Sequence, residues 1–277
     1  MKLLITGGLG HIGSHVLENI NKINKLKKLY IIDSFLSNKI NSLFNLKKKK
    51  IKIFFVKKDL SLKDSLKNFD KVDVVLNLAS ITDAERSLSI KKEIYRNNIG
   101  IFNNIVSYCI KNSAKLIHIS STSVYGKQSS LVDENCDHLK PQTPYAKIKL
   151  LEENILRKNS KKIKFVTFRF GTIAGISKGM RFHTAVNKFC LSAAMNEPIP
   201  VWIGALHQKR PYLSLRDAFK MIKYTIEKNF FNNQIYNILS NNYTVNDIVK
   251  MIKKHKKKIK VKFIKSKIIN QLSYEVS

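Results

Sequence analysis

The first 170 residues alternate short apolar runs with segments in which apolar residues recur at helical spacing. Ile12, Val16, Ile20 and Ile23, for example, fall on one face of a helix. Strands that alternate with helices are typical of βαβ units, in which a parallel sheet is covered on both faces. We therefore predict a doubly wound α/β domain. Its predicted strands are Lys2–Thr6, Leu29–Ile32, Ile51–Val56, Val72–Leu78, Lys115–Ser120 and Lys164–Phe170, and its predicted helices are Ile12–Ile23, one or two within Asp83–Asn112, and Tyr145–Lys158.

After Phe170 this rhythm changes, and the pattern predicts a smaller α+β lobe over residues 171–277. One of its short strands, at 235–239, is expected to return to the main sheet. No Gly/Ser-rich linker separates the two parts, so we expect them to pack together. The helices predicted for this lobe are Phe182–Met195, Leu215–Lys228 and Val245–His255, and the strands are Pro200–Ile203, Ile235–Leu239 and Lys260–Ile264.

The composition is that of a soluble globular protein, with 44% apolar and 25% charged residues among 277. No apolar run approaches the ~18 residues that span a bilayer, so we expect no membrane segment. The start of the chain is too short and too rich in glycine for a signal peptide. Three scattered cysteines without a CxxC pair indicate a reducing cytoplasm, and no ligand-spaced cluster of cysteines and histidines predicts a metal.

The formal net charge of +32 is unusual, and it raises the alternative of a nucleic-acid-binding protein. Lysine supplies most of this charge, since the chain has only seven arginines. The lysines are spread along the chain, and the accompanying excess of Ile and Asn is the composition that an AT-rich genome produces. We therefore interpret the charge as compositional and expect no nucleic-acid partner.

A glycine-rich turn follows the first predicted strand, with GxxGxxG spacing at Gly7, Gly10 and Gly13. Glycines there allow a tight turn and a close approach of the backbone to a pyrophosphate, which the N-terminus of the next helix attracts. Asp33 ends the second strand, 20 residues after Gly13, where a carboxylate accepts hydrogen bonds from a ribose and repels a 2′-phosphate. The segment, which includes His11 and Ile12, predicts a dinucleotide site that prefers NAD to NADP.

A second constellation lies at the end of the fifth strand and on the helix after it. Tyr145 and Lys149 are four residues apart, so they share a helix face and the ammonium can lower the pKa of the phenol. Ser121, at the carboxyl end of a strand, can hydrogen-bond the same substrate oxygen. These three residues predict acid–base chemistry on a substrate hydroxyl.

With these motifs together, the chain resembles the extended short-chain dehydrogenase/reductase family, and specifically its NAD-dependent nucleotide-sugar epimerases and dehydratases. The resemblance spans nearly the whole chain and implies a Rossmann fold. It rests on TGGLGHIG at the start, SSTSVYG, YAKIK and several single positions. It implies that Asp59 and Leu60 bracket the adenine, that Leu78, Ala79 and Ser80 line the cofactor, and that Asn98 positions active-site elements.

The resemblance also implies a substrate side and a mechanism. Tyr145 would take a proton from a sugar hydroxyl while a hydride moves to the nicotinamide, with Lys149 on the nicotinamide ribose and Ser121 on the developing carbonyl. Arg210 would pair with the diphosphate, and the segment 179–183 would be a loop that faces the substrate. Other family members imply a homodimer. The residues implied to touch the substrate are Ser121, Thr172, Asn187, Arg210 and Tyr212.

Departures from the family pattern shape the functional hypothesis. The two positions after Ser121 are Thr122 and Ser123, where dehydratases and decarboxylases of the family usually carry an acid. This favours an epimerase, with C4 of a UDP-hexose as the expected centre and polysaccharide precursors as the expected product. A 4,6-dehydratase, a 4-keto reductase and a non-catalytic NAD-binding protein stay open. Relatives usually continue for some tens of residues, so we also expect the C-terminus to be truncated.

Overall fold

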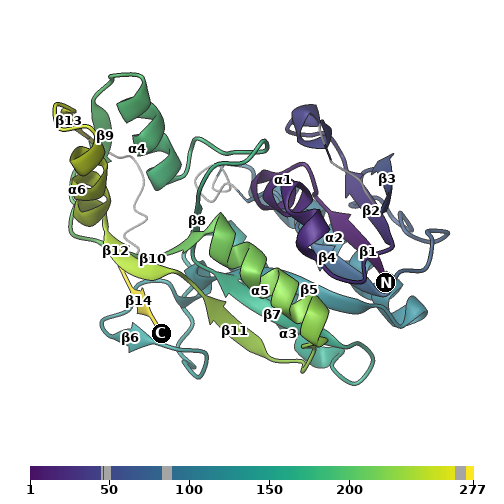
Figure 1. Ribbon diagram of the computed structural model, residues 1–277. Helices are drawn as coiled ribbons and strands as arrows, with labels where there is room; N and C mark the ends of the chain where they lie inside the picture. The colour runs from purple at the N-terminus through teal and green to yellow at the C-terminus, as the bar shows by residue number, and fades with distance from the viewer. Residues whose placement is uncertain (45, 47–50, 83–88, 266–272) are drawn as a thin grey trace.

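A seven-stranded sheet forms the centre of the protein, in a computed structural model that describes residues 1–44, 46, 51–82, 89–265 and 273–277. Every pair of neighbouring strands in this sheet is parallel, and the order is β11-β7-β5-β4-β1-β2-β3 (Figure 1). The order reverses between β1 and β4, which confirms the predicted doubly wound Rossmann fold. The strands are β1 (Lys2–Thr6), β2 (Lys28–Asp33), β3 (Lys52–Lys57), β4 (Val74–Asn77), β5 (Lys115–Ser121), β7 (Phe165–Phe170) and β11 (Ile235–Ile238).

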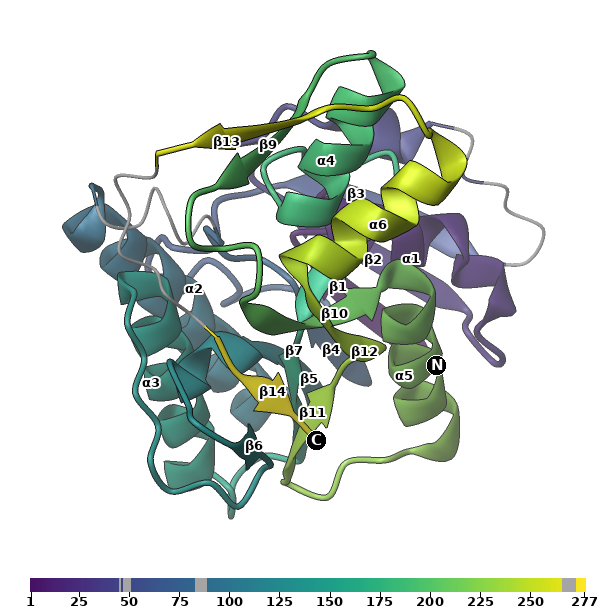
Figure 2. The same cartoon turned by 90° about the vertical axis from the view of Figure 1, so that its left-hand side faces the viewer.

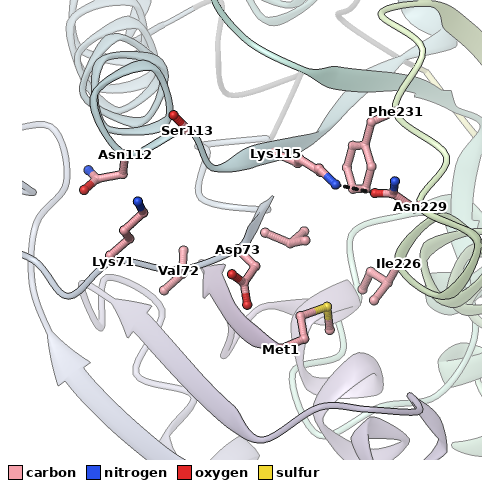
Figure 3. Close-up of a pocket in the computed structure, with 11 residues that line it drawn as sticks. Met1, Lys71, Val72, Asp73, Asn112, Ser113, Lys115, Ile226, Asn229 and Phe231 are labelled. Atoms are coloured by element: carbon pink, nitrogen blue, oxygen red, sulfur yellow. Dashed lines mark hydrogen bonds between the residues drawn. The ribbon is translucent and has the colours of Figure 1, made fainter.

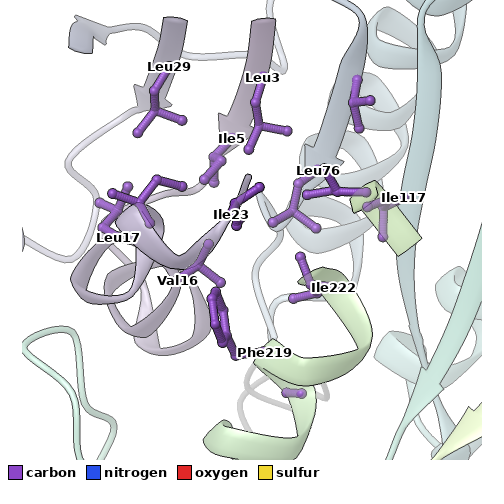
Figure 4. Packing of buried hydrophobic residues seen from close by; sticks show 14 of the residues in the cluster. Leu3, Ile5, Val16, Leu17, Ile23, Leu29, Leu76, Ile117, Phe219 and Ile222 are labelled. Carbon is purple, nitrogen blue, oxygen red and sulfur yellow. The ribbon is translucent and has the colours of Figure 1, made fainter. Parts of the chain in front are cut away.

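Helices cover both faces of this sheet, because alternate residues of each strand point to opposite sides. Leu3 and Ile5 of β1 pack under α1 (His11–Glu18) and α5 (Leu215–Lys228), as Figure 4 shows. Leu4, between them, lies in a second apolar cluster under α2 (Lys91–Asn112) and α3 (Pro144–Lys158). Two layers of helices thus bury the inner strands of the sheet, which explains why they read as continuous apolar runs, while the edge strands β3 and β11 stay partly exposed.

Several helix boundaries differ from the predicted ones. The first predicted helix stops at Glu18, because the Asn19 side chain donates to the carbonyl of His15 and ends the helix; a 3₁₀ turn, η1 (Ile20–Lys22), follows. Of the segment predicted to hold one or two helices, α2 covers the part from Lys91, and residues 83–88 lie outside the described residues. No described helix is long and apolar enough to cross a bilayer.

A second lobe is built around helices α4 (Ala185–Ala194) and α6 (Val245–His255), which share one apolar cluster (Figure 2). The helix predicted from Phe182 begins only at Ala185, because residues 182–184 line the cavity described below and are not helical. This lobe contains a three-stranded sheet, β12-β10-β8, and a parallel pair of β9 with β13. These strands are β8 (Thr172–Ala174), β9 (Ile199–Trp202), β10 (Lys209–Ser214), β12 (Asn241–Thr244) and β13 (Val261–Ile264).

The chain crosses between the two parts more than once. The strand expected at 235–239 is β11, which pairs with β7 at the edge of the main sheet. Phe219, Ile222 and Ile226 of α5 belong to the apolar cluster of the main sheet. We therefore propose that the Rossmann domain covers residues 1–170 and the second lobe residues 171–277, with β11 and α5 of the second part returning to the main sheet.

The last described residues fold back over the body of the protein. Strand β14 (Glu275–Val276) pairs with β6 (Leu131–Val132), as Figure 2 shows near the C-terminus. Tyr274 is buried next to Val124 and Tyr125 in a small apolar cluster of its own. The hydroxyl of Tyr274 lies 3.1 Å from that of Thr122, which begins the 3₁₀ turn η4 (Thr122–Tyr125). The end of the chain therefore contributes to the centre of the protein.

The segment 175–180 of the second lobe lies directly on the glycine turn of the first. The Gly179 N–H donates to Ser14 Oγ at 2.8 Å, and Ser177 Oγ donates to the His11 carbonyl at 2.9 Å. A methyl group on Gly179 would overlap the backbone carbonyl oxygens of Leu9 and Gly10. A further 3₁₀ turn, η2 (Ile40–Leu43), lies beside this contact. The two lobes therefore meet through backbone, with no room for a side chain at residue 179.

We expect Gly179→Ala to lower the free energy of unfolding by about 2 kcal/mol, because backbone atoms have to move apart to admit the methyl group. Urea unfolding followed by circular dichroism measures this change. Gly10→Ala is the matched control: its methyl group meets only the Gly7 carbonyl oxygen, at 3.3 Å, so we expect a much smaller change. Equal stabilities of the two variants would contradict the close contact.

Candidate active site

A cavity of about 650 Å³ opens at the carboxyl ends of the main strands, between the glycine turn, β5, α3 and the second lobe. This is the edge where ligands bind in open α/β sheets, and the volume suits a small-molecule site. Thirteen of the residues predicted to be catalytic or to bind cofactor or substrate line it. They are Gly7, Gly10, His11, Ile12, Gly13, Leu78, Ser80, Ser121, Tyr145, Lys149, Thr172, Arg210 and Tyr212.

The glycine turn has the geometry of an anion cradle. Gly7 adopts a φ of +65°, and a methyl group on it would lie 2.7 Å from the backbone of Ala79. A methyl group on Gly13 would overlap the carbonyl of Gly8, so the helix can start this close to the strand only with glycine there. Gly10 caps α1 without a side chain, which leaves the first N–H groups of the helix open to a ligand. The turn therefore fits a pyrophosphate.

Asp33 lies beside this turn and does not line the cavity. Its Oδ2 accepts the Leu9 N–H at 3.0 Å, and its Oδ1 accepts the Phe35 N–H at 2.9 Å. The carboxylate thus holds the turn on the side away from the cavity, and each of its oxygens keeps a lone pair for another donor. Its contact with a ribose stays a prediction.

The two residues expected around the adenine lie next to each other after β3. Asp59 accepts the backbone N–H and the hydroxyl of Ser61. Leu60 is 3% exposed, and its carbonyl accepts the side-chain amide of Asn104 on α2. Neither residue lines the described cavity, so their role at the adenine stays a prediction.

Asn98 organises the loop after β4. Its amide is 1% exposed, accepts the Ile81 N–H at 2.8 Å and donates to the Ile81 carbonyl at 3.0 Å. This pair of bonds fixes the backbone next to Leu78 and Ser80, which line the cavity, while Ala79 packs against Gly7. Asn98 therefore shapes the cavity wall from within the protein.

Ser121, Tyr145 and Lys149 meet at the cavity wall. Thr143 caps α3 by accepting the Ala146 N–H at 3.2 Å, and Pro144 is the first residue of the helix, so Tyr145 projects from its first turn. Tyr145 is hydrogen-bonded to Ser121. The Lys149 ammonium lies 5.8 Å from the centre of the Tyr145 ring. The predicted spacing thus does bring the phenol, the hydroxyl and the ammonium together.

Some neighbours of Tyr145 raise the pKa of its phenol, and others lower it. Burial disfavours the phenolate and raises the pKa of Tyr145, and the nearby carboxylate of Glu152 raises it further. Lys149, Arg181 and the bond to Ser121 lower it. Lys149 thus acts in the direction expected from the sequence, but burial outweighs it and the pKa of Tyr145 is raised overall.

On the substrate side, Thr172, Arg210 and Tyr212 line the cavity, and Asn187 has a different position. Asn187 is 2% exposed and uses its amide to accept the Gly175 N–H and donate to the Arg181 carbonyl. It supports the loop that carries Arg181 into the cavity. Contact of Asn187 with a substrate stays a prediction.

Several lining residues were missed in the sequence. Trp202 on β9, Lys188 on α4 and Tyr274 near the C-terminus all face the cavity. Trp202 is the only tryptophan of the chain, and this rarity could have marked it as a candidate site residue. Lys188 is one of many lysines, and Tyr274 comes from a segment without periodicity, so neither stood out. Arg181 and His183 lie in the loop that was expected to face the substrate, and both line the cavity.

The charged side chains that the structure describes along this cavity are all positive. Its described lining holds cationic side chains at Lys149, Arg181, Lys188 and Arg210, and no Asp or Glu. Thr122, where dehydratases carry an acid, is 2% exposed and donates to the Phe170 carbonyl at 3.3 Å. The described lining therefore attracts an anion and offers no carboxylic acid to a leaving hydroxyl.

A smaller cavity of about 390 Å³ lies at the opposite edge of the sheet (Figure 3). Lys115 there is hydrogen-bonded to Asn229 and lies 5.6 Å from the centre of the Phe231 ring, and Asp73 accepts the Lys2 N–H. Lys115 and Asp73 thus make contacts that support the fold. Among the described residues, no group of three His, Cys, Asp or Glu side chains could hold a metal ion.

Comparison with known proteins identifies the family of the chain. A model of the NAD dependent epimerase/dehydratase family matches residues 3–238 of the chain. An uncharacterized UDP-glucose epimerase of Bacillus subtilis, YtcB, is 30% identical over 239 residues, which cover 82% of this chain and 73% of the relative. The chain belongs to the NAD dependent epimerase/dehydratase family.

Both branches of the family appear among the similar proteins. A dTDP-D-glucose 4,6-dehydratase of Dictyostelium discoideum is 31% identical over 183 residues, 59% of this chain and 41% of the relative. The solved structure of a UDP-glucuronic acid 4-epimerase from Bacillus cereus, in complex with UDP-glucuronic acid and NAD, is 26% identical with a TM-score of 0.87; the match covers 99% of this chain and 90% of that one. The predicted resemblance and the NAD dependence of the family are confirmed, and the reaction stays open between epimerisation and dehydration.

The surroundings of His11 make stability depend on pH. Its Nε2–H donates to the Gly175 carbonyl at 2.8 Å, and burial lowers the pKa of His11 to about 4. Between pH 6.5 and pH 4 the unfolded state therefore binds a proton that the folded state does not. Stability is lost as the pH falls through this window, by on the order of 3 kcal/mol for His11.

We expect urea unfolding without NAD to show this loss between pH 7 and pH 4. His11→Gln keeps a neutral donor for Gly175 and removes the titration, so its unfolding free energy should fall less steeply. The exposed His138→Gln is the matched control and should follow the wild type. A His11→Gln slope equal to that of the wild type would contradict the assignment.

Proposed function

We propose that this protein is an NAD-dependent nucleotide-sugar epimerase that inverts C4 of a UDP-hexose. One observation carries the proposal: Ser121, Tyr145 and Lys149 meet in a cavity whose described lining is cationic and holds no carboxyl group. The trio suits proton transfer at a sugar hydroxyl, and the cations suit a diphosphate. Dehydratases of the family usually carry a carboxylic acid for the leaving hydroxyl, and no described lining residue is an Asp or Glu. A 4-keto reductase is an alternative within the same family.

The residues present fit NAD. We propose that the turn at Gly7, Gly10 and Gly13 holds the pyrophosphate, that Asp33 accepts from the adenosine ribose, and that Lys149 donates to the nicotinamide ribose. Bound NAD supplies reversible hydride acceptance and return. Further residues proposed to face the cofactor are His11, Ile12, Asp59, Leu60, Leu78, Ala79, Ser80, Asn98 and Tyr145.

The protein side of the reaction is a proton transfer at Tyr145. In its phenolate form, Tyr145 takes the proton of the sugar 4-hydroxyl as the C4 hydrogen leaves, and it returns that proton when hydrogen is delivered to the opposite face. Ser121 donates to the oxygen that becomes a carbonyl. Lys149 stabilises the phenolate. The proton and hydrogen both return to the sugar, so the product is an isomer of the substrate.

The second lobe would hold the rest of the substrate. We propose that Arg210 pairs with the diphosphate, since its planar fork can donate two hydrogen bonds to phosphate oxygens. Thr172, Tyr212 and Asn187 belong to the same proposed subsite. The chain would work in the cytoplasm, where a reducing environment suits its three free cysteines, and would supply polysaccharide precursors. A homodimer through α2 and α3 is part of the proposal.

Incubation with NAD and a panel of UDP-, dTDP- and GDP-hexoses tests the reaction, with products separated by mass-resolved chromatography. We expect a new peak of unchanged mass from a UDP-hexose. Tyr145→Phe should lower turnover at least 100-fold while NAD affinity stays within about twofold, because only the proton-transfer group is lost. A product lighter by one water would establish a dehydratase instead, and full turnover by Tyr145→Phe would refute the assignment of the base.

Arg210→Met should raise the KM for the UDP-hexose about 10- to 100-fold, the loss expected when a charge-assisted hydrogen bond to phosphate is removed. Its NAD dissociation constant should stay within about twofold. The matched control is Lys209→Met on the same strand, because Lys209 is half exposed and pairs with Glu275 away from the cavity. An unchanged KM for Arg210→Met would place the diphosphate elsewhere.

A further inference from the structure

Two adjacent carboxylates lie on the buried face of α3, behind the cavity. Glu152 is 2% exposed and Glu153 is 1% exposed. A buried carboxylate is costly unless it is paired. Glu153 is fully paired, because Arg169 donates to both of its oxygens and Ser120 donates at 2.6 Å. Glu153 thus stabilises the join of α3 to the sheet, and the partner of Glu152 is a different residue.

Glu152 faces Lys149. The ammonium of Lys149 donates to Glu152 Oε2 at 2.8 Å, one helical turn away, and both side chains are buried. The same ammonium lies 5.8 Å from the centre of the Tyr145 ring. Lys149 is therefore shared between the phenol in the cavity and a carboxylate behind it.

The other neighbour of Glu152 is His118 on β5. Its Nε2 lies 3.4 Å from Glu152 Oε2, the side chain has no exposed surface, and Phe102 of α2 packs on the ring at 4.7 Å between centres. Burial and the nearby Lys149 ammonium lower the pKa of His118, so the ring is neutral. Lys149 is thus the cation that Glu152 contacts among the described residues.

We propose that Glu152 is a positioning residue for the reaction: it holds the Lys149 ammonium from behind and offsets part of its positive charge at the Tyr145 phenol. The inference rests on the proposed roles of Tyr145 and Lys149. The groups that act on the phenol are Lys149 and Glu152 from α3, Ser121 from β5 and Arg181 from the second lobe. Those that act on Glu152 are Lys149 and Glu153 from α3, with His118 from β5 in contact.

The direction of the effect follows from the signs of these charges. A cation near a phenol favours the phenolate, and a carboxylate beside that cation reduces the effect. Removing the negative charge of Glu152 therefore exposes Tyr145 to the full charge of Lys149. A residue that only supported packing would leave the titration of Tyr145 unchanged.

The test is the titration of Tyr145 itself, followed by NMR on protein labelled with ¹³C at the tyrosine ring Cζ. Tyr145→Phe identifies the resonance. We expect Glu152→Gln to lower the titration midpoint of Tyr145 by about one pH unit relative to the wild type. The control is His118→Phe, which alters the same buried cluster and keeps the carboxylate, and its midpoint should stay within a few tenths of a pH unit of the wild type.

An unchanged midpoint in Glu152→Gln, or an equal shift in His118→Phe, would overturn the inference. If Glu152→Gln does not fold, Glu152→Asp answers the question: its shorter side chain keeps the charge but withdraws it from Lys149, so the midpoint should also fall, by less. The titration needs no substrate. A lowered midpoint in a protein that converts no sugar nucleotide would keep the electrostatic coupling of Glu152 to Tyr145 and refute the proposed reaction.

Discussion

The whole site depends on how closely two stretches of backbone approach each other. The segment 175–180 lies on the glycine turn and donates through Gly179 N–H and Ser177 Oγ to groups of the first helix. This contact fixes the turn from one side while Asp33 fixes it from the other. It also determines where Arg181 enters the cavity, since only Met180 separates Arg181 from Gly179. The glycine turn and the loop that carries Arg181 are thus held together by direct hydrogen bonds, although they lie more than half the chain apart.

Buried charge on α3 forms the second constraint. Glu152 and Glu153 follow each other on one helix, yet they serve different purposes. Glu153 joins the helix to β7 through Arg169, which also donates to the Tyr125 hydroxyl. Glu152 pairs with the lysine of the reactive trio. The same turn of helix therefore stabilises the fold and sets the electrostatics of the site, and each function has its own carboxylate.

Much of the main sheet could be predicted, because its inner strands are buried on both faces and read as plain apolar runs. The glycine turn and the pair of Tyr145 and Lys149 could also be predicted, since both depend on short spacings along the chain. Ser121 could be added because it ends a strand that the apolar pattern predicts. Strands β8, β10 and β12 could not. β10 contains Lys209, Arg210 and Pro211, and it is a strand only because neighbours far along the chain pair with it. Residues such as Trp202 and Tyr274 reach the cavity through tertiary structure alone.

The pairing of β14 with β6 has a consequence for the order in which the protein is completed. Tyr274, just before β14, lines the cavity and lies 3.1 Å from Thr122, more than half the chain away. A ribosome synthesises the glycine turn long before this tyrosine. The sheet can therefore assemble during translation, while the cavity gains its final wall only after residue 276 has left the exit tunnel. The described cavity is thus completed later than the sheet that carries it.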